Sequence, residues 1–218
     1  MIHALIFDFD GLILDTETPE VQAWRKIYSE YGLPFPQDEW GKIVGGYGIS
    51  NFDAAEHLRD QAGDAIQLDD LRARQRSESD AQTLRQPILP GVVDLIRDAK
   101  HRAIRLAVAS SSPHSWVDTH LSRLGLARHF DRVICADDVA PGRTKPNPDL
   151  FIRALHELRV AADEAIVFED SPNGVKAAKS AGIFVVAVPN PTTSLLKIDG
   201  ADLILKSLTD FDLRKFLY

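Results

Sequence analysis

The sequence contains very little of what would indicate a secreted or membrane-spanning protein. Its 218 residues include a single cysteine, Cys135, so an intrachain disulfide is impossible and a cysteine-based metal site is not expected. The apolar run at residues 4–7 has neither the basic flank nor the small-residue cleavage site of a secretory signal. No apolar run approaches the roughly 20 residues that span a bilayer. We therefore expect a cytoplasmic protein without a membrane partner.

A clustered basic surface is also missing. The 25 Lys and Arg and 32 Asp and Glu residues give a net charge of -7, and the basic residues form no block. Nucleic acids bind to clustered Lys and Arg, so we expect no nucleic-acid partner. No obligate protein partner is evident either. A small anionic substrate stays compatible with this charge, because one pocket can be locally positive on an acidic protein.

Short apolar runs predict the strands of a buried parallel sheet. They are rich in Val, Ile and Phe and do not alternate with polar residues, as is typical of strands covered on both faces. The runs span residues 3–9, 104–110, 131–136, 164–170 and 182–189. Helical patterns separate the later runs, over residues 91–102, 113–125, 147–158 and 172–182. This alternation predicts an α/β fold with a doubly wound, Rossmann-like core.

One long segment departs from this alternation. Residues 16–86 carry no strand pattern and predict helices over residues 18–32, 36–45, 49–63 and 68–85. We therefore predict a catalytic core of residues 1–15 and 87–218 with an inserted helical cap domain of residues 16–86. The tail, residues 212–218, predicts a terminal helix packed on the core.

Polar side chains follow several predicted strands at the point where each strand ends. In open parallel sheets, ligands bind at the carboxyl ends of the strands, so these side chains should meet. Each of these side chains, taken alone, has an ordinary explanation. An Asp can stabilise a turn, Lys145 can be a solvated surface charge, and Ser112 can be the N-cap of the helix after Pro113. Together they supply the groups that phosphoryl transfer requires. They are Asp8, Asp10, Gly11, Ser110, Ser111, Ser112, Lys145, Glu169 and Asp170.

Gathered carboxylates indicate a metal ion. Asp8, Asp10 and Asp170 brought together would repel one another and raise one another's pKa. A hard divalent cation would offset this repulsion, and an oxygen-only ligand set favours Mg²⁺ over Zn²⁺.

Four motifs in order resemble those of the haloacid dehalogenase-like (HAD) hydrolase superfamily: "DFDG", "VASS", "TKPNPD" and "FEDSPNG". The "DFDGLILDTE" opening and the length of the helical insertion are similar to the β-phosphoglucomutase-like phosphatase branch. The resemblance implies that Asp8 is a nucleophile that forms an aspartyl-phosphate. It implies that Asp10 protonates the leaving oxygen and then activates the water that hydrolyses this intermediate.

The same resemblance implies the remaining site residues. Ser110 and the backbone N–H of Ser111 would hold phosphate oxygens, and Lys145 would neutralise developing charge. Gly11 would allow the turn beside the phosphate, and Asn173 would fix the nearby loop or contact the phosphate. Mg²⁺ would be held by Asp8, the backbone carbonyl of Asp10, and Asp170, with Glu169 as a ligand or behind the ligands.

The insertion would act as a mobile cap over a small phosphorylated metabolite. The loop with Gly45, Gly46 and Gly48 would either face the substrate or only separate two helices. Tyr47 would line the pocket, whereas for Trp24 and Trp40 we favour packing within the cap.

Departures from the mutase pattern favour a phosphatase. The resemblance places a histidine in the mutase where this chain has Glu20, and a cap arginine where it reads "GGYGISNF". Arg72, Arg74 or Arg76 could compensate, so a β-phosphoglucomutase-type transfer stays open. A phosphometabolite-binding regulator without turnover is a second alternative, which the presence of both Asp8 and Asp10 disfavours. A dehalogenase is a third, and Asp10 together with the "ED" pair of "FEDSPNG" argues against it.

The remaining titratable residues suggest no further chemistry. The seven histidines show no metal-ligand spacing, and His101, His114 and His120 are expected on helix surfaces. Cys135 is expected to be a small buried apolar residue.

Overall fold

A single parallel sheet forms the centre of the molecule in the computed structural model, which describes residues 1–46, 51–63 and 67–217. Its strand order is β3-β2-β1-β4-β5-β6. The strands are β1 (Ala4–Phe7), β2 (Arg105–Ala109), β3 (Arg132–Ile134), β4 (Ala165–Glu169), β5 (Phe184–Ala187) and β6 (Leu203–Ile204). Each neighbouring pair runs parallel. The predicted doubly wound α/β fold is confirmed.

Helices cover both faces of this sheet, which explains why the strand sequences are continuously apolar. Leu5 and Phe7 face α5 (Val92–His101) and α6 (His114–Arg123) in one hydrophobic cluster. Ala4 and Ile6 face the opposite way, toward α7 (Asp149–Leu158) and α8 (Pro172–Ser180). Alternate side chains of one strand therefore enter two separate cores, and both are buried.

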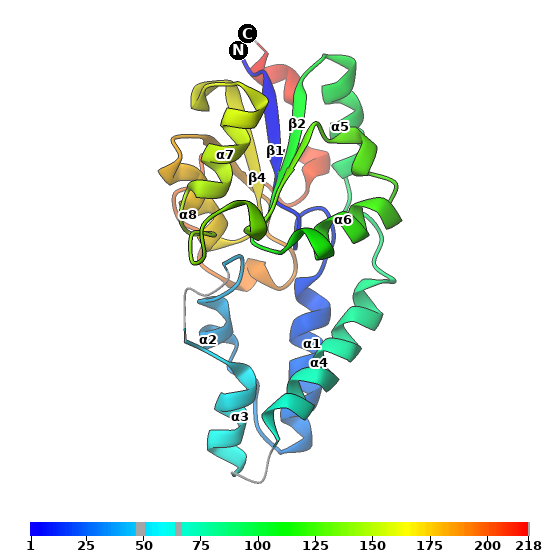
Figure 1. Cartoon of the computed structure of the whole chain (residues 1–218), viewed down its shortest axis with the longest axis vertical. Coiled ribbons are helices and arrows are strands. Elements are labelled where there is room, and N and C mark those ends of the chain that lie inside the picture. Colours follow the sequence, from blue (N-terminus) through cyan, green and yellow to red (C-terminus); the bar gives the residue numbers. More distant parts are fainter. Residues whose placement is uncertain (47–50, 64–66, 218) are drawn as a thin grey trace.

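The helices described between β1 and α5 make up the lower half of Figure 1. They are α1 (Glu17–Glu30), α2 (Gln37–Gly41), α3 (Ala54–Ala62) and α4 (Leu68–Thr83). Helices α1, α3 and α4 share a small core, which includes Trp24, Ile27 and Leu58, whereas Trp40 of α2 packs in a separate cluster with Val21. No described helix has both the length and the hydropathy that a membrane crossing requires.

The structure corrects several predicted boundaries. The α2 helix ends at Gly41 although the pattern predicted helix through residue 45, and α3 begins at Ala54 instead of residue 49. Asp53 caps α3 by accepting the N–H of Glu56, which fixes that start. The predicted terminal helix is only a 3-10 turn, Leu213–Phe216. The two-residue strand β6 was not predicted, because so short a run carries no periodicity.

The two chain segments that join the helices to the sheet lie side by side. Leu14 forms an antiparallel bridge with Ile88, and the N–H of Leu89 donates to the carbonyl of Ile13 at 2.9 Å. The pairing places the beginning of α1 and the end of α4 over the carboxyl ends of the strands. The chain termini lie together at the opposite end of the sheet (Figure 1), where the N–H of Ile2 donates to the carbonyl of Phe216.

Candidate active site

The predicted site residues converge where the strand order reverses direction. β1 lies between β2 and β4, so the crossover connections diverge on either side of it and leave a crevice at its carboxyl end. The chain stays extended one residue past β1, because the N–H of Asp8 donates to the carbonyl of Phe168 at 2.9 Å. The side chains of Asp8, Ser110, Lys145, Glu169 and Asp170 are all buried there.

Lys145 is paired with two carboxylates. Its ammonium donates to Asp8 Oδ1 and, at 2.6 Å, to Glu169 Oε1. Burial lowers the pKa of Lys145, but the charges of Asp8 and Glu169 more than compensate and keep the net pKa above its ordinary value. Both carboxylates therefore favour the charged form of Lys145 beside the proposed nucleophile.

Asp8, Glu169 and Asp170 form a buried acidic cluster. Each offers one oxygen, and these oxygens all lie within 4.8 Å of one another. Burial raises the pKa of both Asp8 and Asp170 well above the ordinary value, and the charge of Glu169 raises each further. Lys145 supplies one positive charge against these three carboxyl groups, so a second cation would relieve the remaining repulsion.

One oxygen of this cluster indicates where such a cation fits. Asp170 Oδ1 is buried and has no hydrogen-bond partner among the described residues, whereas Asp170 Oδ2 accepts from Asn190 Nδ2 at 2.8 Å. Glu169 Oε2 is already satisfied by the N–H groups of Asp170 and Ser171 and by the Ser171 hydroxyl. The geometry therefore fits a divalent ion held by Asp8 and Asp170, with Glu169 behind them.

Gly11 makes room for this arrangement. Its φ of +81° is one that side chains rarely adopt, and a Cβ there would lie 2.2 Å from Asp170 Oδ2. Asn190 Nδ2 also donates to the Gly11 carbonyl at 3.3 Å. Gly11 thus lets the turn after β1 approach the acidic cluster, and its expected contact with phosphate stays a prediction. Sequence reasoning missed Asn190, which lies after the fifth strand.

Asp10 is held by donors from the segment after β2. Its Oδ2 accepts from the hydroxyls of Ser110 (3.1 Å) and Ser112 (2.7 Å), and its Oδ1 accepts from the indole N–H of Trp116 (2.8 Å). The prediction that Ser112 caps a helix is wrong: Pro113 occupies the N-cap position of α6 without a side-chain cap. Trp116 was not predicted, although it lies on the first turn of the helix after the serines.

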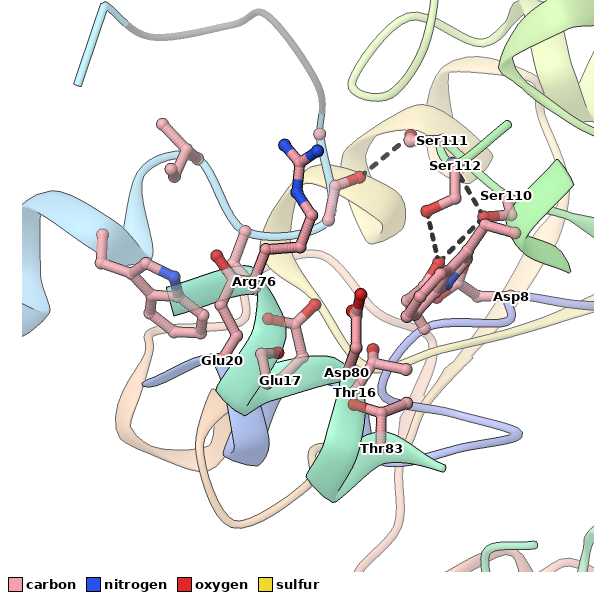
Figure 2. Close-up of a pocket in the computed structure, with 18 of the residues that line it drawn as sticks. Asp8, Thr16, Glu17, Glu20, Arg76, Asp80, Thr83, Ser110, Ser111 and Ser112 are labelled. Atoms are coloured by element: carbon pink, nitrogen blue, oxygen red, sulfur yellow. Dashed lines mark hydrogen bonds between the residues drawn. The ribbon is translucent and has the colours of Figure 1, made fainter. Parts of the chain in front are cut away.

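A cavity of about 380 Å³ lies between these groups and helices α1, α2 and α4 (Figure 2). The sheet side contributes Asp8, Asp10, Ser110, Ser111, Ser112 and Trp116. The helical side contributes Thr16, Glu17, Glu20, Trp40, Ile43, Val44, Gly45, Gly46, Gln75, Arg76, Ser79, Asp80 and Thr83. A volume in this range suits a small metabolite.

Contacts join the glycine loop to the sheet side of this cavity. Asn173 Nδ2 donates to the carbonyls of Lys42 (3.2 Å) and Val44 (2.9 Å), and the Ser111 hydroxyl donates to the carbonyl of Gly45 (3.3 Å). Asn173 thus fixes the loop, one of its two expected roles. Gly45 and Gly46 face the cavity, whereas the predictions for Tyr47 and Gly48 lie outside the described residues.

The two tryptophans of the helices differ. Trp24 packs against Tyr28 in the core of the helices, as predicted. Trp40 is buried too but also lines the cavity, so packing alone does not describe it.

Two glutamates of α1 also line the cavity. Burial raises the pKa of Glu20 to about 7, although a hydrogen bond from Trp40 acts in the opposite direction and lowers it. Glu17 was not singled out from the sequence; burial, and next the charge of Glu20, raise its pKa well above the ordinary value.

The three arginines of α4 also differ. Arg72 is paired with Asp53 at 2.9 Å, and Arg74 donates to both carboxylate oxygens of Glu30. Of the three, Arg76 alone is a lining residue of the cavity.

The other predictions for single residues have mixed outcomes. His101 is exposed and His114 partly exposed, as expected, but His120 is only 3% exposed, so its surface placement is wrong. Its ring lies 4.3 Å from that of Trp116 and accepts from Arg123 Nε, on the side of α6 that packs toward Phe9. Cys135 is buried as predicted, and burial raises the pKa of its thiol.

Comparison with known proteins agrees with this geometry. Residues 5–188 match the family model described as haloacid dehalogenase-like hydrolase. YhcW of Bacillus subtilis is 39% identical over all of this chain and 97% of its own length. The phosphorylated carbohydrates phosphatase of Thermotoga maritima is 34% identical, over 84% of this chain and 82% of its own. The structure of CbbY from Rhodobacter sphaeroides with xylulose-(1,5)bisphosphate is 27% identical, covers 96% of both chains and has a TM-score of 0.71.

The chain belongs to the haloacid dehalogenase-like hydrolase family. Within it, the relatives are of the β-phosphoglucomutase-like phosphatase branch, which confirms the resemblance seen in the four motifs. The expected enzyme class, a phosphoric monoester hydrolase, is confirmed as well.

Proposed function

We propose that this enzyme is a Mg²⁺-dependent phosphatase that hydrolyses a small phosphorylated metabolite, a sugar phosphate, through an aspartyl-phosphate on Asp8. The observation that carries the proposal is the buried acidic cluster, in which Lys145 pairs with Asp8 while Asp170 Oδ1 lacks a partner among the residues described. A nucleophilic carboxylate beside a fixed cation and an unpartnered carboxylate oxygen suits attack on an anionic phosphorus centre.

Each residue then has a definite part in the reaction. An Asp8 oxygen forms a bond to phosphorus while the bond from phosphorus to the leaving oxygen breaks, and Asp10 gives that oxygen a proton. Water then attacks phosphorus, Asp10 takes up its proton, and the Asp8–phosphorus bond breaks to release phosphate. Ser110 and the Ser111 N–H bind phosphate oxygens, and Lys145 offsets their charge. Bound Mg²⁺ would supply further positive charge next to the phosphate.

The helical segment provides the wall that faces the leaving group. We propose that residues 16–86 are a cap on a core of residues 1–15 and 87–218, and that the paired segments at Leu14 and Ile88 are its hinge. A mutase must hold a second phosphate, and among the described residues of this wall Arg76 is the one cation beside the carboxyl groups of Glu17, Glu20 and Asp80. The cytoplasmic location stays a prediction.

The test is phosphate release from a panel of sugar, nucleotide and glycerol phosphates, with and without Mg²⁺. We expect stoichiometric, Mg²⁺-dependent release from at least one sugar phosphate. Interconversion of glucose 1-phosphate and glucose 6-phosphate faster than phosphate release would instead support the mutase. Binding with equal, near-zero release by the wild type and by Asp8→Asn would support the regulator.

Removal of the metal should abolish activity and lower stability. A chelator should stop phosphate release, and Mg²⁺ at about 100 times its Kd should stabilise the fold by about 2.7 kcal/mol. Asp170→Asn should remove most of this Mg²⁺-dependent rise in Tm, because it removes the unpartnered oxygen's charge. Asp94→Asn, at an exposed carboxylate on α5, is the matched control and should keep it. An unchanged Tm on addition of Mg²⁺ would contradict the metal site.

Trp116→Phe should lower kcat while leaving KM almost unchanged. The substitution removes the donor to Asp10 Oδ1, and a hydrogen bond to a charged group contributes about 1.5–3 kcal/mol, which is roughly 10- to 150-fold in rate. Trp24→Phe, away from the cavity, controls for the loss of an indole. The measurement is the steady-state kinetics of both variants. If Trp116→Phe and Trp24→Phe have equal kcat values, then Trp116 does not position Asp10.

A further inference from the structure

One side of α4 faces the cavity with polar groups only. Along this helix just Leu71 and Thr83 are buried, and Leu71 belongs to the core of the helices. The positions that line the cavity recur at helical spacing, so they form one stripe on the helix surface. We call them the α4 stripe: Gln75, Arg76, Ser79, Asp80 and Thr83.

Thr83 carries the most informative observation in this stripe. Its side chain is 1% exposed, yet its hydroxyl has no hydrogen-bond partner in the part of the chain that the structure describes. A threonine on a helix commonly donates to a carbonyl one turn back, as Thr119 does to Ser115 at 2.7 Å. A buried hydroxyl without a partner is unfavourable, so an unmet group at a cavity wall points to a ligand that satisfies it.

The charges around the stripe select the kind of ligand. Glu17, Glu20 and Asp80 line the helical side of the cavity together with Arg76 (Figure 2). A second phosphate or a carboxylate on the leaving group would meet three carboxyl groups there and, among the described lining residues, one cation, Arg76. Alcohol groups suit the same wall, because each can donate to a carboxylate and accept from a guanidinium or amide N–H.

We propose that the α4 stripe is the leaving-group subsite and that it binds the hydroxyls of a neutral, polyhydroxylated leaving group. The substrate class is then a sugar or polyol monophosphate with no second anionic group. This inference rests on the proposed phosphatase function and adds the residues that choose the substrate. Thr83 meets one hydroxyl directly, and Asp80, three residues before it on the same helix, is placed to accept from another.

The test compares kcat/KM for a hexose monophosphate, the matching hexose bisphosphate and phenyl phosphate, which has no alcohol groups. The wild type should prefer the hexose monophosphate to both others. Thr83→Val keeps the shape but removes the hydroxyl, so it should lower the preference for hexose monophosphate over phenyl phosphate by about 10- to 100-fold. Ser77→Ala, on the exposed side of α4, is the matched control and should keep the wild-type preference.

A second readout separates binding from structure. Because no described residue partners the Thr83 hydroxyl in the free enzyme, Thr83→Val should leave Tm equal or higher. A lowered Tm would show a structural role for the hydroxyl and overturn the proposal. So would an unchanged preference in Thr83→Val, or a wild type that hydrolyses the bisphosphate best. In each of those cases, phosphate release from phenyl phosphate would still support the phosphatase function. If no substrate released phosphate, the proposed function itself would be overturned.

Discussion

Asp8→Asn should reduce phosphate release by at least about 10⁴-fold, to the level of the uncatalysed assay. An amide cannot form the aspartyl-phosphate, and its acidic neighbours are not free to replace it. Asp170 and Glu169 share the buried cluster with Asp8, but Glu169 is engaged by Lys145 and two backbone N–H groups. Asp170 Oδ2 accepts from Asn190, and its other oxygen, Oδ1, is the one proposed to hold the metal.

The loss should not come from unfolding, and this can be checked directly. Burial and the charge of Glu169 both raise the pKa of Asp8, so its carboxylate is unfavourable in the folded state without a metal. Its amide removes one negative charge from the cluster, and we expect a Tm equal to or above that of the wild type in the absence of Mg²⁺. Asp94→Asn controls for the same chemical change at an exposed position. Activity above one hundredth of wild type in Asp8→Asn would contradict the nucleophile assignment.

The sequence is enough to predict the sheet and the residues at its edge, for a physical reason. Strands buried on both faces must be continuously apolar, so Ala4–Phe7 and Ala165–Glu169 stand out, and parallel pairing then places the residues after each strand at one edge of the sheet. That reasoning brings Asp8, Ser110 and Asp170 together without any knowledge of distances. Lys145 joins them from the loop after the third predicted strand, and its place in the "TKPNPD" motif indicated it as well.

Contacts that cross between elements are harder to predict. Trp116 and His120 look like ordinary positions on an amphipathic helix, and only the docking of α6 beside Phe9 turns one toward Asp10 and buries the other. The α4 stripe is likewise polar and looks like a solvated surface in the sequence, and only the folded chain brings it to the cavity. Short elements such as β6 have too few residues for a pattern to emerge.

Lys145→Met should lower the free energy of unfolding more than any of the other single substitutions predicted above. Its side chain is only 1% exposed, and it holds two carboxylates that are themselves buried. Removing one partner of a buried ion pair leaves an uncompensated charge, which typically lowers the free energy of unfolding by about 3–5 kcal/mol. Phosphate release should be lost at the same time, because the cation beside Asp8 is gone.

Urea denaturation without Mg²⁺ measures this effect, and two further variants make it interpretable. Lys179→Met breaks the partly exposed pair with Asp202, which should lower stability by at most about 1 kcal/mol. Adding Glu169→Gln to Lys145→Met removes one of the two carboxylates left without a cation, so the double variant should regain part of the lost stability, although not activity. If Lys145→Met and Lys179→Met lower the free energy of unfolding equally, then the Lys145 ammonium does not offset the repulsion among the buried carboxylates. Recovery of stability in the double variant, with activity still absent, would separate the part that Lys145 plays in folding from its part in holding phosphate.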